Sequence, residues 1–424
     1  MFNKKEVQIF LKSKLVSNAF IYVVSEVLVK AIPIFLIPLL TKKLSNADYG
    51  RLMSFQTIAY FLNIIVALGT YSIIWPFLNE VKENKEALKK TISSFLIIPF
   101  LVALVCIFIL LFVVGESFLG LPKIWIILAL FLAIFEYAIN VLSFIWVFQK
   151  KAWHNAIFKV SRTVVEIASI FIIFYYFGLN WQNRINSILV SGAIIGVYTF
   201  IYFYRNDFLT LKIGNQKVKE NLKLSIPAIP YELNLSFRQL VERWLIITIL
   251  GLPAMGVFGL AVQLTIPLHL LGVAFLNALI PSIYEKINQN SKTGLLNVIK
   301  LYCGVLTAAL FAYLIILYFS YKYFLGINYF DSIPLAFVIS VAVLFRSFHG
   351  LFSQFLLYNK KTLLSTKIAI ASTIVGILCM WLALKINLPL GGAFAILFVE
   401  MFTFFVILYF SNKLYPLFSK QNLN

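Results

Sequence analysis

Twelve long apolar runs constrain this chain more than any other feature of its sequence. Each is long enough to be a membrane helix, which needs roughly 20 apolar residues to cross the hydrocarbon core. The chain is 61% hydrophobic and 12% charged, whereas a soluble domain carries about 25% charged residues. We therefore predict an all-α membrane protein with about twelve transmembrane helices. The runs lie near 15–40, 52–77, 91–115, 122–148, 156–178, 185–204, 224–250, 255–280, 297–320, 332–357, 364–386 and 389–412.

The basic residues between the runs predict the orientation of the chain. With a cytoplasmic N-terminus and twelve spans, 25 Lys and Arg residues fall on the inner side and seven in the outer loops. The positive-inside rule then places both termini in the cytoplasm. The basic segment before the first run resembles a signal peptide, but that run is too long for a cleaved hydrophobic region. We expect it to remain as the first helix.

The net charge of +20 has the same origin. Its basic residues are scattered through short loops, so we expect no nucleic-acid partner.

The three cysteines, Cys106, Cys303 and Cys379, lie inside apolar runs. They suit a role as small apolar side chains better than a role in disulfides. Histidines and cysteines never cluster with metal-ligand spacing, and no phosphate-binding G-x-x-x-x-G-K-[ST] run is present. We expect no metal and no cofactor.

The longest polar segment, Arg205 to Lys223, falls near the middle of the chain. We interpret it as a cytoplasmic linker (205–223) between an N-terminal six-helix bundle (1–204) and a C-terminal six-helix bundle (224–424). A short repeat supports this division, because Leu44 to Gly50 and Leu250 to Gly256 share a Leu-to-Gly spacing at an offset of 206. Six spans per half predict a parallel repeat, with its axis along the membrane normal.

Three segments carry a resemblance to a known family. Residues 33–50 read PIFLIPLLTKKLSNADYG, an apolar helix that leads into the loop Thr41 to Ser45, which closes with Asp48, Tyr49 and Gly50. This segment resembles the signature between the first two helices of bacterial polysaccharide exporters of the O-antigen flippase type. Residues 225–263 resemble the seventh helix and following turn of that family, with Glu242-Arg243 where the family has an Asp-Arg or Asp-Lys pair. Residues 358–367, followed by 388–392, give a third match.

The resemblance implies a MATE-like fold of two six-helix bundles. Their central cavity would open alternately to either side of the membrane. Proline residues inside or beside the helices, Pro33, Pro38, Pro227 and Pro230, are candidate bend points.

Ionisable residues at membrane depth form stripes on several predicted helices. Such groups are costly in lipid and usually face a bundle interior or a wet cavity. Three pairs of opposite charge at i, i+4 also suit simple neutralisation within one helix: Glu26–Lys30, Arg162–Glu166 and Arg238–Glu242. The number of polar stripes favours a shared hydrated cavity. The stripes are Tyr22, Glu26, Lys30 and Pro33; Gln56, Tyr60, Asn63 and Thr70; Glu136, Asn140 and Ser143; Arg162, Glu166 and Ser169; Arg238 and Glu242; and Arg346, His349 and Ser353.

The sign of the deep charges indicates an anionic cargo. The cations Lys30, Arg238, Arg243 and Arg346 have no topological role, and Arg51 lies at the expected outer rim. Arginine offers a planar fork of donors that suits phosphate oxygens, whereas lysine acts as a point charge. We predict these five residues as contacts for a diphosphate.

Carboxylates at similar depth are candidates for binding a coupling ion, either a proton or sodium. We predict this role for Glu26, Glu136 and Glu166. Glu400, His269 and His349 are further candidates, although His349 also suits a buried structural histidine.

We predict a flippase, not an enzyme, in the bacterial inner membrane. Its substrate would be an undecaprenyl-diphosphate-linked oligosaccharide, moved by alternating access. Membrane lipids surround it, and a polysaccharide polymerase is a candidate partner. One alternative is an exporter of the same fold for a drug or the peptidoglycan precursor. The other is a membrane polysaccharide polymerase or ligase, which the short outer loops disfavour.

Overall fold

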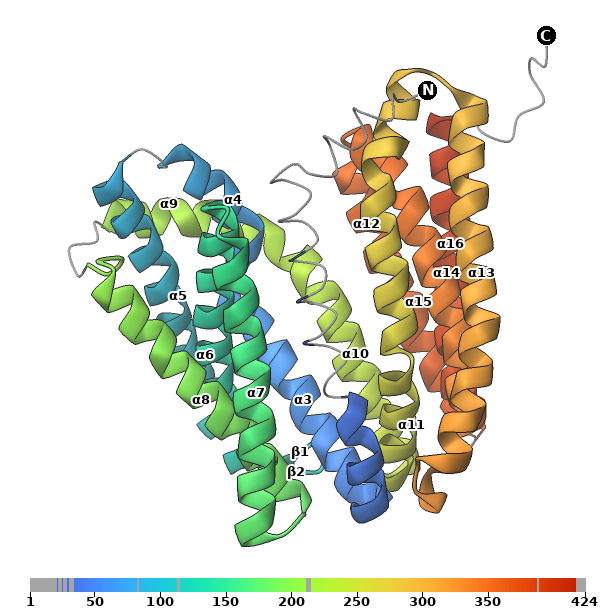
Figure 1. The fold of residues 1–424 in the computed structure, drawn as a ribbon, viewed down its shortest axis with the longest axis horizontal. Helices are drawn as coiled ribbons and strands as arrows, with labels where there is room; N and C mark the ends of the chain where they lie inside the picture. Colours follow the sequence, from blue (N-terminus) through green and yellow to red (C-terminus); the bar gives the residue numbers. More distant parts are fainter. Residues whose placement is uncertain are drawn as a thin grey trace. The chain divides into compact units, whose positions relative to one another are not determined.

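The computed structural model describes residues 21, 25, 29, 34–81, 84–112, 115–210, 215–386 and 389–416, without the side chains of 215–218, 220 and 231. In these residues the chain is almost entirely helical, as predicted (Figure 1). Nine helices are long and apolar enough to span a membrane, counted over the described ranges alone. The predicted runs near 156–178 and 224–250 form two further long helices, α7 and α10. The all-α membrane fold is therefore confirmed, and the orientation of the termini stays a prediction.

The helices follow one another through short connections. A hairpin of two strands, β1 (Ser117–Phe118) and β2 (Leu121–Pro122), precedes α6. The helices are α3 (Asn46–Ala67), α4 (Thr70–Glu80), α5 (Lys85–Phe112), α6 (Lys123–Phe148), α7 (Ala152–Phe177), α8 (Trp181–Arg205), α9 (Asn215–Ser225), η1 (Ile226–Ala228), α10 (Ile229–Leu250), α11 (Leu252–Leu264), α12 (Ile266–Asn288), α13 (Lys292–Tyr323), η2 (Ile327–Tyr329), α14 (Ser332–Tyr358), α15 (Thr362–Lys385) and α16 (Pro389–Leu414).

The chain forms two compact units. Unit 1 comprises residues 1–36 and 51–240, and unit 2 comprises residues 37–50 and 241–424. The division falls inside α10, whose first half belongs to unit 1 and whose second half belongs to unit 2. The grouping of the membrane spans into two six-helix bundles joined by a linker at 205–223 stays a prediction.

Three predicted runs are interrupted. The run near 52–77 was predicted as one helix but forms α3 and α4, because Leu68 and Gly69 adopt left-handed backbone angles with φ of 48° and 74°. The run near 224–250 begins with the short helix η1, at Pro227 and Pro230. The run near 255–280 is divided at Thr265, two residues before Pro267. Proline lacks a backbone N–H and disfavours continuation of a helix, which explains the last two interruptions.

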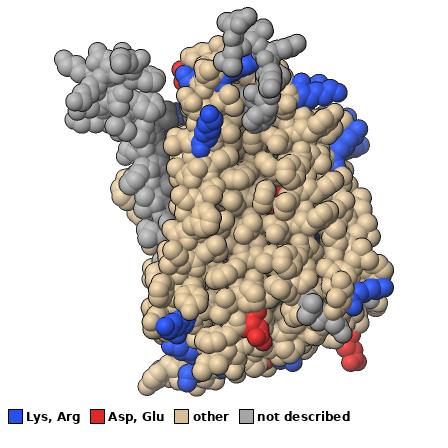
Figure 2. Space-filling model, turned by 90° about the vertical axis from the view of Figure 1, so that its right-hand side faces the viewer, with Lys and Arg blue, Asp and Glu red and all other residues tan. Residues whose placement is uncertain are grey.

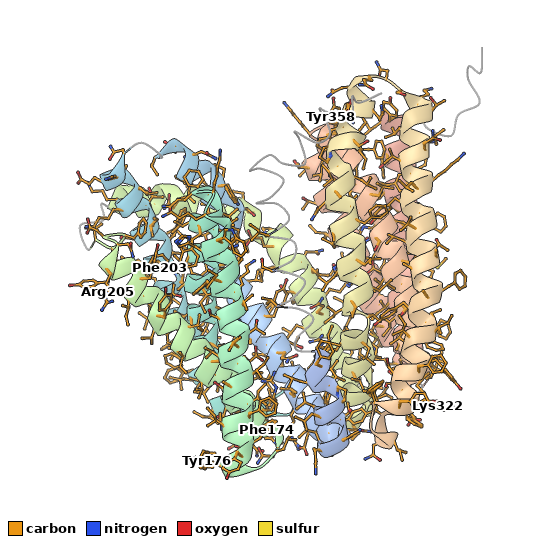
Figure 3. The ribbon with its side chains drawn as sticks, in the orientation of Figure 1. Phe174, Tyr176, Phe203, Arg205, Lys322 and Tyr358 are labelled. Carbon is orange, nitrogen blue, oxygen red and sulfur yellow. The ribbon has the colours of Figure 1, made fainter. Side chains whose placement is uncertain are left out.

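Side chains at the unit surfaces support membrane insertion. On α13 large apolar side chains point outward, among them Phe311 (64% exposed), Ile315 and Ile316. Figure 2 shows the corresponding face as largely free of charge across its middle, with Lys and Arg toward its two ends. In Figure 3, Arg205 and Tyr176 lie at opposite ends of unit 1, and Lys322 and Tyr358 at opposite ends of unit 2. Charged and amphipathic side chains at the ends of apolar helices are typical of membrane proteins.

Candidate functional site

The predicted site residues are distributed over both units. Arg51 lies on α3, Glu136 on α6 and Glu166 on α7. Arg238 and Arg243 lie on α10, and Arg346 lies on α14. Glu26 and Lys30 lie outside the described residues, as does Pro33.

Two ion pairs between helices hold the predicted carboxylates of unit 1. Arg162 Nη2 donates to Glu136 Oε1, joining α7 to α6. Arg184 Nη2 donates to Glu166 Oε1 at 2.8 Å, joining α8 to α7. The alternative that Arg162 neutralises Glu166 within one helix is therefore wrong. The neighbouring helices bring each carboxylate an arginine from another helix instead.

Arg184 is one of the seven basic residues that the topology prediction places in outer loops. The structure places it on the first turn of α8, where it is 4% exposed and donates a second hydrogen bond to Ser187 Oγ at 3.0 Å. The signal was present in the sequence. Asn180 caps α8 by accepting a hydrogen bond from the Asn183 N–H at 2.7 Å, so the helix begins at Trp181, three residues before Arg184. The side of the membrane on which Arg184 lies stays a prediction.

A network of neutral hydrogen bonds joins α3, α4 and α6. Tyr71 OH donates to Asn63 Oδ1 at 3.1 Å and accepts from Asn140 Nδ2 at 3.0 Å. The hydroxyls of Thr70 and Tyr137 are 2.8 Å apart. Asn63, Thr70 and Asn140 were predicted on two polar stripes, and the structure brings these three into one cluster. Tyr71 and Tyr137, which link them, were not predicted.

A carboxylate that sequence reasoning missed lies next to this network. Glu232, in the first turn of α10, accepts from Ser72 N–H at 3.0 Å and from Ser72 Oγ at 2.5 Å. Among the described residues its other oxygen, Oε2, is buried and has no hydrogen-bond partner. The signal was the segment SIPAIPYE, whose prolines interrupt the helix shortly before an acidic residue.

A second charged cluster lies within unit 2. Glu400 of α16, 3% exposed, accepts from Arg346 Nη2 at 2.7 Å. His349 Nε2, one turn further along α14, lies 3.1 Å from the other carboxylate oxygen. The predicted stripe of Arg346 and His349 therefore meets Glu400, whereas Ser353 Oγ donates back to the His349 carbonyl of its own helix. Arg346 keeps some exposure, at 29% of its side chain.

Charged residues near the middle of α10 complete the predicted set. Arg238 and Glu242 are each 6% exposed, and Arg243 is partly buried. Charges buried in a helix that spans a membrane are costly and usually functional. Arg51, predicted at the outer rim, lies over the ring of Trp181, with its guanidinium carbon 5.5 Å from the ring centroid.

The first family motif forms a tight helix crossing inside unit 2. Ser45 Oγ accepts from the Asp48 N–H at 3.1 Å and donates to Asp48 Oδ2 at 2.8 Å, which starts α3 at Asn46. Asp48, Tyr49 and Gly50 therefore belong to the helix, and the prediction that they close the loop is wrong. Tyr49 is fully buried and its OH donates to Gln263 Oε1 at 2.5 Å.

Gly50 and Gly256 meet at this crossing of α3 and α11. A Cβ on Gly50 would lie 2.4 Å from the Leu252 carbonyl oxygen. A Cβ on Gly256 would lie 1.9 Å from the carbonyl oxygen of Asn46. Only glycine permits two membrane helices to approach this closely, so both glycines of the short repeat serve one contact.

We compared the chain with known proteins. A family model described as "Polysaccharide biosynthesis protein" matches residues 15–287. "Lsg locus putative protein 1" of Haemophilus influenzae is 25% identical over 65% of this chain and 67% of that protein. An "Uncharacterized membrane protein" of the same organism is 22% identical over 74% and 78%, respectively.

Solved structures give the same fold. A multidrug resistance MATE family transporter of the MOP superfamily, in an inward-facing conformation, superposes with a TM-score of 0.70. It is 15% identical, and the match covers 96% of each chain. A MATE protein in a straight conformation gives a TM-score of 0.60 at 14% identity, over 95% of this chain and 96% of that one. At these identities the comparison shows a shared fold.

Proposed function

Because this chain belongs to the polysaccharide biosynthesis protein family, we propose that it is a flippase for an undecaprenyl-diphosphate-linked oligosaccharide. The family and the MATE-like fold are those of membrane exporters. The finer proposal is that the polar glycan head crosses the inner membrane by alternating access while the lipid tail stays in the bilayer. The resemblance of residues 33–50 to the O-antigen flippase signature supports this substrate class.

Buried arginine on α10 is the observation that carries the proposal. Arg238 is 6% exposed within a predicted membrane span. The cost of such a charge makes a role in binding an anion more favourable than a purely structural one. We propose that Arg238 and Arg243 contact the diphosphate, with Lys30, Arg51 and Arg346 as further contacts. The guanidinium of Arg346 already bonds Glu400, so we rank it below Arg238.

The predicted carboxylates retain a proposed role in ion coupling. Glu136 and Glu166 are both held by arginines in unit 1. A proton or sodium ion that took the place of an arginine there would loosen a contact between two helices. Glu26 belongs to the same proposal.

The test is a pair of substitutions at Arg238 in the native host. We expect Arg238→Ala to abolish surface polysaccharide at unchanged membrane abundance, and Arg238→Lys to retain part of it if charge outweighs the fork geometry. Arg205→Ala is the matched control, because Arg205 is exposed at the end of α8 (Figure 3). Normal polysaccharide in Arg238→Ala would rule out the assigned contact.

A same-fold exporter with another substrate is the second candidate, since the solved neighbours include a multidrug resistance transporter. The deep arginines disfavour cationic drugs as cargo. A deletion strain distinguishes the candidates by what accumulates. The proposed flippase predicts lipid-linked oligosaccharide, whereas the alternative predicts retained drug or peptidoglycan precursor. A polysaccharide polymerase is a candidate partner for the flippase.

A further inference from the structure

Two interrupted helices of unit 1 meet at one place. The left-handed residues Leu68 and Gly69 end α3 and start α4. Gly69 lies against the end of α9, because a Cβ there would be 2.2 Å from the carbonyl oxygen of Ser225. The chain then continues through η1 into α10, with Glu232 in the first turn. Interrupted helices form the ion sites of many transporters, because their exposed backbone groups and helix ends bind charge.

The first turn of α4 depends on α10 for its cap. Its own capping residue is Gly69, which makes no side-chain hydrogen bond to the helix. Glu232 provides this bond from α10, accepting from both the N–H and the hydroxyl of Ser72. A carboxylate is favoured at this position because the N-terminus of a helix carries partial positive charge. The same N–H also lies 3.3 Å from the Gly69 carbonyl oxygen.

The second oxygen of the Glu232 carboxylate has no ion-pair partner among the residues that the structure describes. In the part of the chain that the structure describes, Glu232 makes no ion pair and Oε2 has no hydrogen-bond partner. Glu136 and Glu166, by contrast, are each held by an arginine. Among the described residues, the phenols of Tyr60 on α3, Tyr71 on α4 and Tyr137 on α6 lie within electrostatic range of Glu232, and Glu136 of α6 lies within range of the same Tyr71 phenol.

We propose that Glu232 is a proton-binding site that controls a latch between α10 and the N-terminus of α4. The carboxylate form holds Ser72. When Oε2 takes a proton from water, Glu232 becomes a neutral carboxylic acid and the two bonds from Ser72 weaken, because bonds to a charged acceptor are about twice as strong. Oε2 itself is buried, but the residue as a whole is partly exposed, so water reaches the side chain and the proton passes from there to Oε2.

The latch matters because α10 contains residues of both units. Protonation of Glu232 would weaken the contact of the first turn of α10 with α4. The step from proton binding to transport rests on the proposed flippase function. Proton binding and the latch do not, and they are tested without substrate.

Infrared difference spectroscopy on the purified full-length protein measures the protonation directly. The chain has 16 acidic side chains, so we expect lowering of the pH to produce a composite carbonyl band of protonated carboxylic acids, and Glu232→Gln to remove one component of that band. Glu285→Gln, which changes an acid elsewhere in the chain, is the control. A difference spectrum unaffected by Glu232→Gln would overturn the proposal, as would a band that responds to sodium at constant pH and not to protons.

Ser72→Ala is a second variant that keeps the carboxylate. Removal of one donor disfavours the charged form, so the midpoint of the infrared titration should rise by about one pH unit or more. Hydrogen exchange gives an independent readout of the latch. The Ser72 amide should exchange about tenfold faster below the midpoint than above it, after correction for intrinsic rates. An unmoved midpoint in Ser72→Ala, or pH-independent protection of the Ser72 amide, would refute the latch.

Discussion

Unit 1 and unit 2 each contain a carboxylate cluster, and the two clusters are built differently. In unit 2, Glu400 bonds Arg346 and lies beside His349, so the negative charge is matched on the neighbouring helix. In unit 1, Glu232 bonds the N-terminus of α4 and lies near three phenols. A buried carboxylate that is matched by a cation depends on that cation for its stability, whereas one held by neutral donors has no charged partner to lose. The contrast suggests a structural cluster in unit 2 and a responsive one in unit 1.

The largest effect is expected at Glu400. Glu400→Ala leaves Arg346 beside a site without its counter-charge, which should lower the free energy of unfolding by about 3 kcal/mol. Thermal unfolding of the detergent-solubilised protein measures this loss. Glu400→Gln, which retains an acceptor, should lose less. A melting temperature unchanged in both variants would show that the pair is not structural.

Arg184→Ala is expected to have a somewhat smaller effect. It leaves Glu166 without the cation of α8, and we expect a loss of about 2 kcal/mol because Glu166 is partly exposed. The double variant Arg184→Leu with Glu166→Leu should restore most of that stability, since replacing a buried pair with apolar residues is often neutral. Failure of the double variant to recover would indicate a role for Arg184 beyond the pair.

Tyr71→Phe examines the neutral network of unit 1. It removes the phenol that joins Asn63 to Asn140, and two amides lose one bond each. We expect a loss of about 1 kcal/mol in the free energy of unfolding. Denaturation in mixed micelles suits this small change. A loss as large as that of Glu400→Ala would erase the distinction between the two clusters.

Asp207→Ala should have the smallest effect. Asp207 bonds Lys89, but its side chain is 83% exposed, and exposed ion pairs contribute little to stability. We expect an unchanged melting temperature and unchanged surface polysaccharide. A lower melting temperature in Asp207→Ala would mean that exposed ion pairs also stabilise this protein. The losses expected for the buried pairs could then no longer be attributed to their burial.

The fold could be predicted from sequence because the bilayer leaves few choices. An apolar run of spanning length must satisfy its backbone within itself, so it forms a helix. The interruptions were harder to predict. Proline marks those at η1 and Pro267, but the interruption after α3 depends on left-handed backbone angles at Leu68 as well as Gly69. The left-handed conformation of Leu68 is imposed by the surrounding structure. Leucine does not itself favour this conformation, so the sequence gives no sign of it.

The pairing of charges was less predictable than their presence. Periodicity correctly placed Arg162 and Glu166 on one face of α7, but their partners come from α6 and α8. Which helices are neighbours depends on packing across the whole unit. Glu232 was missed because a lone acid after Pro230 looks like an ordinary first-turn residue. Its significance depends on the missing cap of α4, which lies 160 residues away in sequence.

The crossing of Gly50 with Gly256 has a consequence for the substitutions that the chain tolerates. A Cβ on Gly50 would lie 3.2 Å from the backbone nitrogen of Gly256, and a Cβ on Gly256 would lie 3.1 Å from the backbone nitrogen of Gly50. Each glycine therefore faces backbone atoms of the other helix, and backbone cannot move aside as a flexible side chain can. A larger residue at one position would force α3 and α11 apart, and no substitution at the other position could make room for it.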